Sequence, residues 1–309
     1  MQHQTFILSS KDSTGIFVNH WFGDKAPKAV VMISHGMAEH SARYARLADT
    51  LVASGYAVFA LDHRGHGQTA KNGVQGHYAD QDGWQKVVGD LDSLNQHIRT
   101  LHPKTPIILL GHSMGSYIGQ AYLMAHGDGV QGAIWSGSNF QSKLLYKAAG
   151  FVALFERFRQ GPTGRSALIN FLSFGAFNKA FKPTRTEFDW LSRDPAEVDK
   201  YIADPQCGFL CTNQMWVDLL GGLQGISSVE SLSKINPSIP MMVLGGSHDP
   251  VSDGSRLNDL AQALQKNGRS ALTLKIYPEG RHEMFNETNR AAVTADVLAW
   301  LESTFQQIH

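Results

Sequence analysis

The chain has 309 residues, a length that suits one large α/β domain with an insertion, or two domains. Its 42% hydrophobic and 17% charged residues are typical of a globular enzyme. The 27 basic and 27 acidic residues balance to a formal net charge of zero. This balance argues against a nucleic-acid surface or a polyanionic partner.

Signals for export, membrane spanning and metal binding are weak. The first residues lack a basic region followed by an apolar core, and no apolar run approaches the ~20 residues that span a bilayer, so we expect a cytoplasmic protein. Cys207 and Cys211 form no disulfide framework, and reduced thiols are favoured over a pair or a partial metal site. The 14 histidines come without H-E-x-x-H or C-x-x-C spacing, so we expect no catalytic metal.

Strands and helices alternate in the first half of the chain. Residues 5–8 and 16–22 flank a turn, which predicts an antiparallel hairpin at a sheet edge. The apolar runs that follow predict buried parallel strands at 29–33, 55–61, 106–110 and 130–136, with helices at 41–53, 82–101 and 116–126. This alternation predicts an α/β fold with a mostly parallel sheet and helices on both faces.

The alternation stops between residues 139 and 236, where helix-like segments follow one another without a convincing strand. It resumes with a strand at 240–246, a helix at 255–267, a strand at 271–277 and a last helix at 287–305. We therefore predict a core built from residues 1–138 and 237–309, with a sheet of about eight strands. Residues 139–236, hereafter the insertion, are predicted to form a helical cap over it.

The stretch Gly111-His112-Ser113-Met114-Gly115 lies between an apolar strand and a helix. Strand, G-x-S-x-G and helix is the pattern of a nucleophile elbow, in which a strained turn exposes the serine hydroxyl above the end of a strand. The two glycines fit this turn because strand and helix approach so closely that a Cβ would clash. Ser113 is therefore the candidate nucleophile.

A serine nucleophile needs a base within hydrogen-bond reach and a third group that orients the base. Loops after the last two predicted strands offer Asp249 and His282, in the order serine, acid, histidine. Asp253 competes for the acid role, but it lies farther from the strand end and suits a helix cap. His248 competes as base, but it shares a loop with the acid. We therefore predict Asp249 and His282 as the partners of Ser113.

The oxyanion of a tetrahedral intermediate needs preorganised hydrogen-bond donors. One donor is expected to be the backbone N–H of Met114, directly after the nucleophile. The other is expected from the loop His35-Gly36-Met37, where the N–H of Met37 is the better candidate. His35 is expected to shape this loop rather than to transfer protons.

With these residues assembled, the sequence resembles the α/β-hydrolase branch of monoacylglycerol lipases, bacterial lysophospholipases and serine aminopeptidase-like hydrolases. The resemblance runs from about residue 30 to about 290, and it implies the α/β-hydrolase fold and the same two oxyanion donors. It also implies that Asp62, Arg64 and His66 form an ion-paired structural turn. The matching stretches are His35–His40 with Arg43-Tyr44, Asp62–Gly67, Gly111–Gly115, Gly246–Val251 and Gly280–Glu283.

Substrate-binding residues are expected on both sides of the nucleophile. Glu39 and Arg43 are placed at a polar headgroup pocket, and His112 lies next to Ser113 in the elbow. In the insertion, segments 144–158 and 167–174 are apolar on more than one helix face. One face packs on the core, and the other lines an acyl-chain tunnel, with Phe151 and Phe155 as candidates, or touches a membrane surface. Burial of both faces in protein is equally compatible with the pattern.

These residues predict a serine hydrolase of single-chain lipid esters such as monoacylglycerols or lysophospholipids, working through an acyl-enzyme and without a cofactor. A short-chain carboxylesterase is the nearest alternative, and a serine aminopeptidase is the next. The aminopeptidase needs carboxylates in the pocket, for which Glu156, Glu187, Asp189 and Asp194 are candidates. A non-catalytic binding protein is disfavoured because Ser113, Asp249 and His282 are all present. The sequence does not indicate an oligomeric state.

Overall fold

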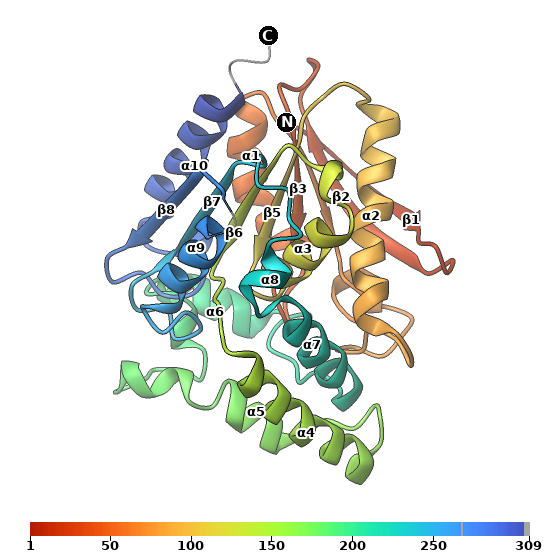
Figure 1. Cartoon of the computed structure of the whole chain (residues 1–309), viewed down its shortest axis with the longest axis vertical. Coiled ribbons are helices and arrows are strands. Elements are labelled where there is room, and N and C mark those ends of the chain that lie inside the picture. Colours follow the sequence, from red (N-terminus) through yellow and green to blue (C-terminus); the bar gives the residue numbers. More distant parts are fainter. Residues whose placement is uncertain (267, 306–309) are drawn as a thin grey trace.

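The structure is a computed structural model that describes residues 1–266 and 268–305 (Figure 1). Across these residues the strands form one sheet in the order β1-β2-β4-β3-β5-β6-β7-β8. The predicted mostly parallel sheet of about eight strands is therefore confirmed. The strands are β1 Gln2–Ser9, β2 Gly15–Phe22, β3 Val30–Ser34, β4 Ala57–Leu61, β5 Ile107–His112, β6 Gly132–Ser136, β7 Met241–Gly246 and β8 Leu272–Tyr277.

The predicted hairpin forms the antiparallel edge of the sheet. β2 pairs antiparallel with both β1 and β4, and every later pairing, from β4 to β8, is parallel. Strands β3 to β6 are buried throughout their length, which explains why their sequences are continuous apolar runs. Parallel strands end at the same sheet edge, so the loops after β3, β5, β6, β7 and β8 are brought together there.

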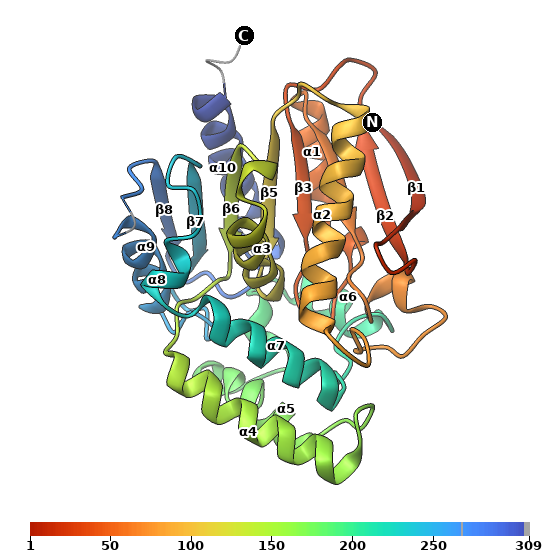
Figure 2. The same ribbon diagram turned by 45° about the vertical axis from the view of Figure 1, so that its right-hand side comes forward.

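Helices cover both faces of the sheet (Figure 2). One face packs against α1 (Ala45–Ala53) and α10 (Arg290–Phe305). The other face packs against α2 (Gly83–Leu101), α3 (Met114–Ala125) and α9 (Arg256–Gln265). Two of the predicted helices start later than the sequence suggested. The first four residues of segment 41–53 form a 3-10 helix, so α1 begins at Ala45, and α10 begins at Arg290.

The insertion lies between β6 and β7, across the carboxyl ends of the strands (Figure 2). Among its described residues the secondary structure is helical, and several helices begin at a side chain that caps the first turn, as Ser142 and Thr212 do. α7 packs on α4 and also on α2 and α3 of the sheet layer. Its α-helices are α4 Lys143–Gln160, α5 Ala167–Ser173, α6 Pro195–Ala203, α7 Asn213–Ile226 and α8 Val229–Leu232.

Short 3-10 helices complete the described secondary structure; they are Ser41–Tyr44, Gly67–Ala70, Gly127–Gly129, Phe177–Phe181, Asp189–Leu191 and Met284–Asn286. A search of the described helices for a long apolar segment that could cross a bilayer found none.

The junction between β5 and α3 is sterically full. A Cβ built on Gly111 would lie 2.6 Å from the Cα of Ser116 and 2.7 Å from the carbonyl oxygen of Gly115. A Cβ on Gly115 would collide with the carbonyl oxygens of Ser34 and His35 at the end of β3. Both glycines are therefore required by the close approach of strand and helix, as the sequence predicted.

Gly111→Ala is expected to lower the free energy of unfolding by about 1–3 kcal/mol, because the new methyl group meets backbone that has no room to move. Urea denaturation followed by circular dichroism measures the change. Gly89→Ala in α2 is the matched control, since a Cβ there meets nothing within 4 Å and alanine favours the helix. Equal stability of the two variants would contradict the crowding.

Candidate active site

Ser113 occupies a strained turn between β5 and α3. Its φ of 50° and ψ of −122° are unusual for a residue with a side chain. Its backbone is held on both sides, because its N–H donates to the Ser136 carbonyl at 2.8 Å and its carbonyl accepts from the Ser116 hydroxyl at 2.6 Å. These contacts fix the turn and leave the Ser113 side chain at the wall of a cavity.

Asp249 and His282 meet at the carboxyl ends of β7 and β8. The two side chains are buried, and His282 Nδ1 lies 3.0 Å from Asp249 Oδ1. The competing residues lie elsewhere: Asp253 is exposed and pairs with Arg256, and His248 is exposed beside Ser247. The structure thus brings together the acid and base that the order of the loops predicted, and His282 lines the same cavity as Ser113.

The electrostatic surroundings make His282 a stronger base than a free imidazole. Burial lowers its pKa, but the carboxylates of Asp249, Glu283 and Glu39 together outweigh this effect, so the pKa of His282 is raised above 6.5. His112 lies against it, with ring centroids 4.8 Å apart. Burial and the neighbouring His282 lower the pKa of His112 to about 4, so His112 is neutral at pH 7.

The backbone N–H groups of Met114 and Met37 remain the predicted oxyanion donors. Met114 is the first residue of α3, so its N–H has no acceptor within the helix. Met37 lines the cavity beside Ser113. Its loop is fixed by neighbours: Glu39 Oε1 accepts the Gly36 N–H at 2.5 Å, and the buried His35 ring accepts the His63 N–H at 3.0 Å. His35 therefore shapes the loop, as expected.

The cavity has a volume of about 360 Å³ and a wall of aromatic and polar residues. Near Ser113, at what we call the polar end, it is lined by His112, Glu39, Glu283 and His282. The insertion lines most of the rest, with the aromatic residues and with the polar side chains of Ser166, Asn170, Asn178 and Glu187. The aromatic lining residues are Phe171, Phe174, Phe188, Trp190, Tyr201, Phe209 and Trp216.

The predicted positions of Phe151 and Phe155 at the substrate are wrong. Neither lines the cavity, and their side chains are 63% and 60% exposed on the outer face of α4. The inward face of α4 carries Tyr146, Val152 and the fully buried Ala153, so Phe151 and Phe155 point to solvent. Phe171 and Phe174, from the second apolar segment, lie at the cavity instead.

Arg43 lies behind the cavity wall and does not reach its lumen. Its guanidinium donates to both Glu283 oxygens at 2.6 and 2.7 Å, and to Glu39 Oε2 at 2.7 Å. Burial opposes the charge on Glu39, but Arg43, the His112 and His35 rings and the Gly36 N–H together outweigh it, and the pKa of Glu39 falls to about 2. Two carboxylates thus share one guanidinium, which leaves the polar end of the cavity negatively charged.

The turn that contains Asp62, Arg64 and His66 is structural, in keeping with the resemblance. Arg64 forms ion pairs with Asp90 at 2.7 Å and with Asp12 at 2.8 Å. Asp62 accepts hydrogen bonds from the N–H groups of Ser41 and Gln68. These contacts tie the turn after β4 to neighbouring segments.

The structure also reveals two positioning residues that the sequence did not suggest. Trp190 of the insertion packs on the His282 ring, with centroids 5.1 Å apart, and its carbonyl accepts the His282 N–H at 3.4 Å. Gly137 has a φ of +58°, and a Cβ there would lie 3.0 Å from His282 Cε1. Gly137, directly after β6, could have been recognised from the sequence, whereas no sequence pattern linked Trp190 to His282.

Comparison with known proteins places the chain in a family. The profile of the family described as serine aminopeptidase, S33, matches residues 25–289. A monoacylglycerol lipase of Mycolicibacterium smegmatis is 30% identical over 92% of this chain and 91% of its own length. A monoglyceride lipase of Rattus norvegicus is 28% identical over 91% and 84% of the two chains.

Solved structures agree with the sequence comparison. A carboxyl esterase from Bacillus coagulans, solved in complex with glycerol, superposes with a TM-score of 0.91 at 25% identity, covering 99% of both chains. A monoglyceride lipase from Saccharomyces cerevisiae shares the fold with a TM-score of 0.75 at 21% identity, covering 98% of this chain and 94% of its own. The chain therefore belongs to the serine aminopeptidase S33 family of α/β-hydrolases.

Proposed function

We propose that the chain hydrolyses carboxylic esters of single-chain lipids, with Ser113 as nucleophile. The observation that carries this proposal is the buried Asp249–His282 pair at the wall of an aromatic cavity that also exposes the strained Ser113. The relatives named monoacylglycerol lipase and monoglyceride lipase support the choice of lipid esters. The apolar wall suits an acyl chain, because burying each methylene of that chain contributes about 0.8 kcal/mol.

The geometry suggests a role for each residue in the reaction. Ser113 Oγ attacks the ester carbonyl while His282 Nε2 takes its proton, and Asp249 holds the Nδ1 proton and stabilises the charged ring. The N–H groups of Met37 and Met114 bind the oxyanion. His282 then protonates the leaving alcohol. Water, activated by the same histidine, releases the fatty acid from Ser113 and restores the enzyme.

The charge at the polar end favours monoacylglycerols over lysophospholipids. Glu39 and Glu283 line the cavity there, and Arg43 is the single guanidinium between them. A phosphate brought beside this negative group is repelled, whereas glycerol hydroxyls donate hydrogen bonds to carboxylates. His112, neutral at pH 7, adds a further polar contact near Ser113.

The alternative functions are less well supported. A short-chain carboxylesterase would use the same residues, but it would leave most of the aromatic cavity unfilled. An aminopeptidase needs a free carboxylate for the substrate ammonium, and three of the four candidates are engaged: Glu156 binds Arg159 and Ser166, Asp189 binds Thr186, and Asp194 caps α6. Glu187 is the remaining candidate that lines the cavity.

We also propose that the insertion contacts lipid surfaces through α4 and α5. Phe158, the most exposed of their apolar side chains, is 90% exposed, and Lys143 and Lys147 are exposed on α4. Apolar residues with neighbouring cations are typical of interfacial helices. The patch, hereafter the insertion patch, consists of Leu144, Leu145, Phe151, Leu154, Phe155, Phe158, Leu168, Phe171 and Leu172.

Hydrolysis of esters of graded chain length tests the substrate class. We expect kcat/KM for glycerol monoesters to rise from butyrate toward palmitate, because each added methylene finds apolar wall. Lysophosphatidic acid with the same acyl chain should react more slowly, and amino-acyl arylamides should not react. A rate that falls steadily beyond butyrate would count against the lipid proposal.

The controls for this assay separate chemistry from binding. A fluorophosphonate probe should modify Ser113 in the folded protein and should leave Ser113→Ala unlabelled. Ser113→Ala should also abolish hydrolysis of every ester in the series. Absence of labelling in folded, unmodified protein would overturn the serine-hydrolase proposal itself.

The pH dependence of kcat/KM reports the protonation of His282. Only the neutral ring accepts the Ser113 proton, so activity falls as pH drops through the pKa of His282. Since this pKa is raised above 6.5, we expect the acidic limb above pH 6.5. Asp249→Asn should reduce kcat by about 10⁴-fold and move the limb downward. An acidic limb at or below pH 6.5 in the unmodified enzyme would contradict this reading of the site.

Vesicle sedimentation tests the insertion patch. Phe155→Glu with Phe158→Glu should reduce binding to phosphatidylcholine–phosphatidylglycerol vesicles about tenfold or more. The reason is that two phenyl rings that would insert into the bilayer are replaced by charged side chains. Hydrolysis of a dissolved butyrate ester should not change. Ile7→Glu on the edge strand β1 is the matched control, with Ile7 64% exposed and outside the insertion. Equal binding by the double variant and the control would refute the membrane contact.

A further inference from the structure

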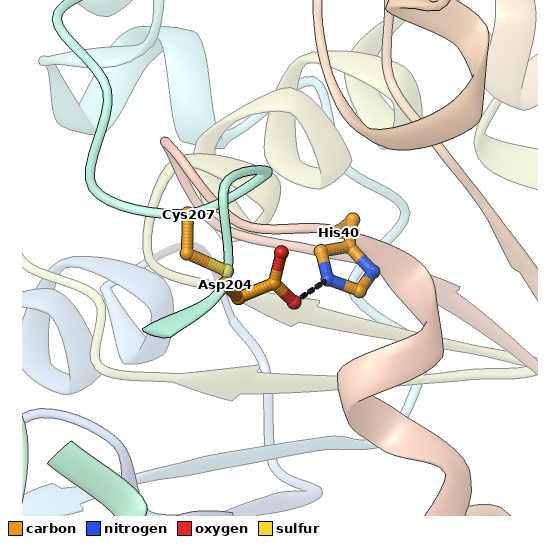
Figure 3. Close-up of side chains that lie close together, drawn as sticks. All are labelled: His40, Asp204 and Cys207. Atoms are coloured by element: carbon orange, nitrogen blue, oxygen red, sulfur yellow. Dashed lines mark hydrogen bonds and ion pairs between the residues drawn. The ribbon is translucent and has the colours of Figure 1, made fainter. Parts of the chain in front are cut away.

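Three side chains of types that can ligate a metal lie close together where the loop after β3 meets the insertion (Figure 3). His40 lies three residues after Met37, and Asp204 and Cys207 follow directly after α6. His40 Nε2, a carboxylate oxygen of Asp204 and Cys207 Sγ all lie within 4.8 Å of one another. The mechanism proposed above uses none of these three residues.

We propose that His40, Asp204 and Cys207 form a binding site for a zinc-class divalent cation. One imidazole nitrogen, one carboxylate oxygen and one thiolate sulfur are the mixed, borderline-soft donor set that Zn²⁺ prefers to Mg²⁺ or Ca²⁺. Three protein ligands leave the fourth tetrahedral position for water. With one thiolate and one carboxylate, the ligand set neutralises the charge of the cation.

The positions of the donor atoms are close to those of a zinc site. Ligands at about 2.0–2.3 Å from zinc lie about 3.3–3.8 Å from one another in a tetrahedron. His40 Nε2 and Asp204 Oδ2 are 2.8 Å apart and would separate slightly, while the widest pair would close by about 1 Å. Side-chain rotations supply such shifts, because Asp204 and Cys207 belong to the same short loop.

The surroundings provide both support and access. Asp204 Oδ1 accepts the N–H of Gln206 at 2.8 Å, which orients the carboxylate and leaves Oδ2 for the cation. The Asp204 side chain is 33% exposed, so an ion can enter from solvent, whereas His40 and Cys207 are almost buried. Burial raises the pKa of the Cys207 thiol, and the nearby Arg43 counteracts part of this effect. Binding therefore releases the thiol proton to the solvent.

The cation would join two segments that already meet at the active site. The carbonyl of Ala38, next to Met37, accepts hydrogen bonds from the Tyr201 hydroxyl at 2.9 Å and from the Gly208 N–H at 3.0 Å. A metal on His40, Asp204 and Cys207 would replace the direct His40–Asp204 hydrogen bond with coordination that also includes Cys207, between the same two segments. The proposal of a cation site depends only on these three side chains and not on the proposed hydrolase activity.

Isothermal titration of the full-length, reduced protein with Zn²⁺ tests the site. We expect one ion per chain, with release of one proton from Cys207 seen as a dependence of the heat on the buffer. Cys207→Ser and Asp204→Asn should each weaken binding more than about tenfold, since even loss of an outer-shell contact costs 10–100-fold. Cys211→Ser is the matched control, because Cys211 is the other buried thiol and lies outside the ligand set.

Titration with Co²⁺ gives a second readout that does not rely on affinity. A thiolate-to-cobalt charge-transfer band should appear in the unmodified protein and in Cys211→Ser, and it should be absent in Cys207→Ser. Circular dichroism confirms that each variant is folded. The proposal is overturned if zinc fails to bind the folded protein, or if Cys207→Ser and Cys211→Ser bind zinc equally well.

Discussion

The close approach of α3 to β5 and β3 is the constraint on which the site depends. Gly115 lies directly against the carbonyl groups of Ser34 and His35, where a methyl group would not fit. The same contact brings the start of α3 beside the loop after β3. Met114 and Met37, the proposed oxyanion donors, therefore owe their positions to backbone packing, whatever their side chains are. The proposed oxyanion site is a consequence of how tightly three segments are packed.

Charge is distributed unevenly around His282. Asp249, Glu39 and Glu283 all raise its pKa, and Arg43 is engaged by two of these three carboxylates. Such buried ion pairs contribute little net stability, because desolvation cancels most of the Coulombic gain. Their effect is on reactivity: in the proposed reaction, the buried carboxylates stabilise the imidazolium that forms when His282 takes the Ser113 proton. His112 stays neutral and adds no opposing charge.

The sequence predicted the core of the fold well because buried parallel strands and amphipathic helices leave periodic patterns. It predicted the partnership of Asp249 and His282 because loops at strand ends must meet at one sheet edge. It failed at Phe151 and Phe155 for a physical reason: an apolar helix has two faces, and periodicity does not say which one meets the cavity. Trp190 was missed because it sits in a three-residue 3-10 helix, too short to leave a periodic pattern, where contacts depend on the completed tertiary structure.

The insertion contacts His282 and its loop, in addition to lining the cavity. Besides the contact of Trp190 with His282, the Leu191 carbonyl accepts the Glu283 N–H at 2.8 Å, and the Ser192 hydroxyl donates to the Asn286 carbonyl at 2.8 Å. Residues 190–192 therefore support the loop that carries His282. A chimera that exchanged residues 139–236 as one module would bring in a foreign support for His282. Residues 190–192 would therefore have to stay with the core, although insertion residues on both sides of them, such as Phe188 and Tyr201, line the cavity.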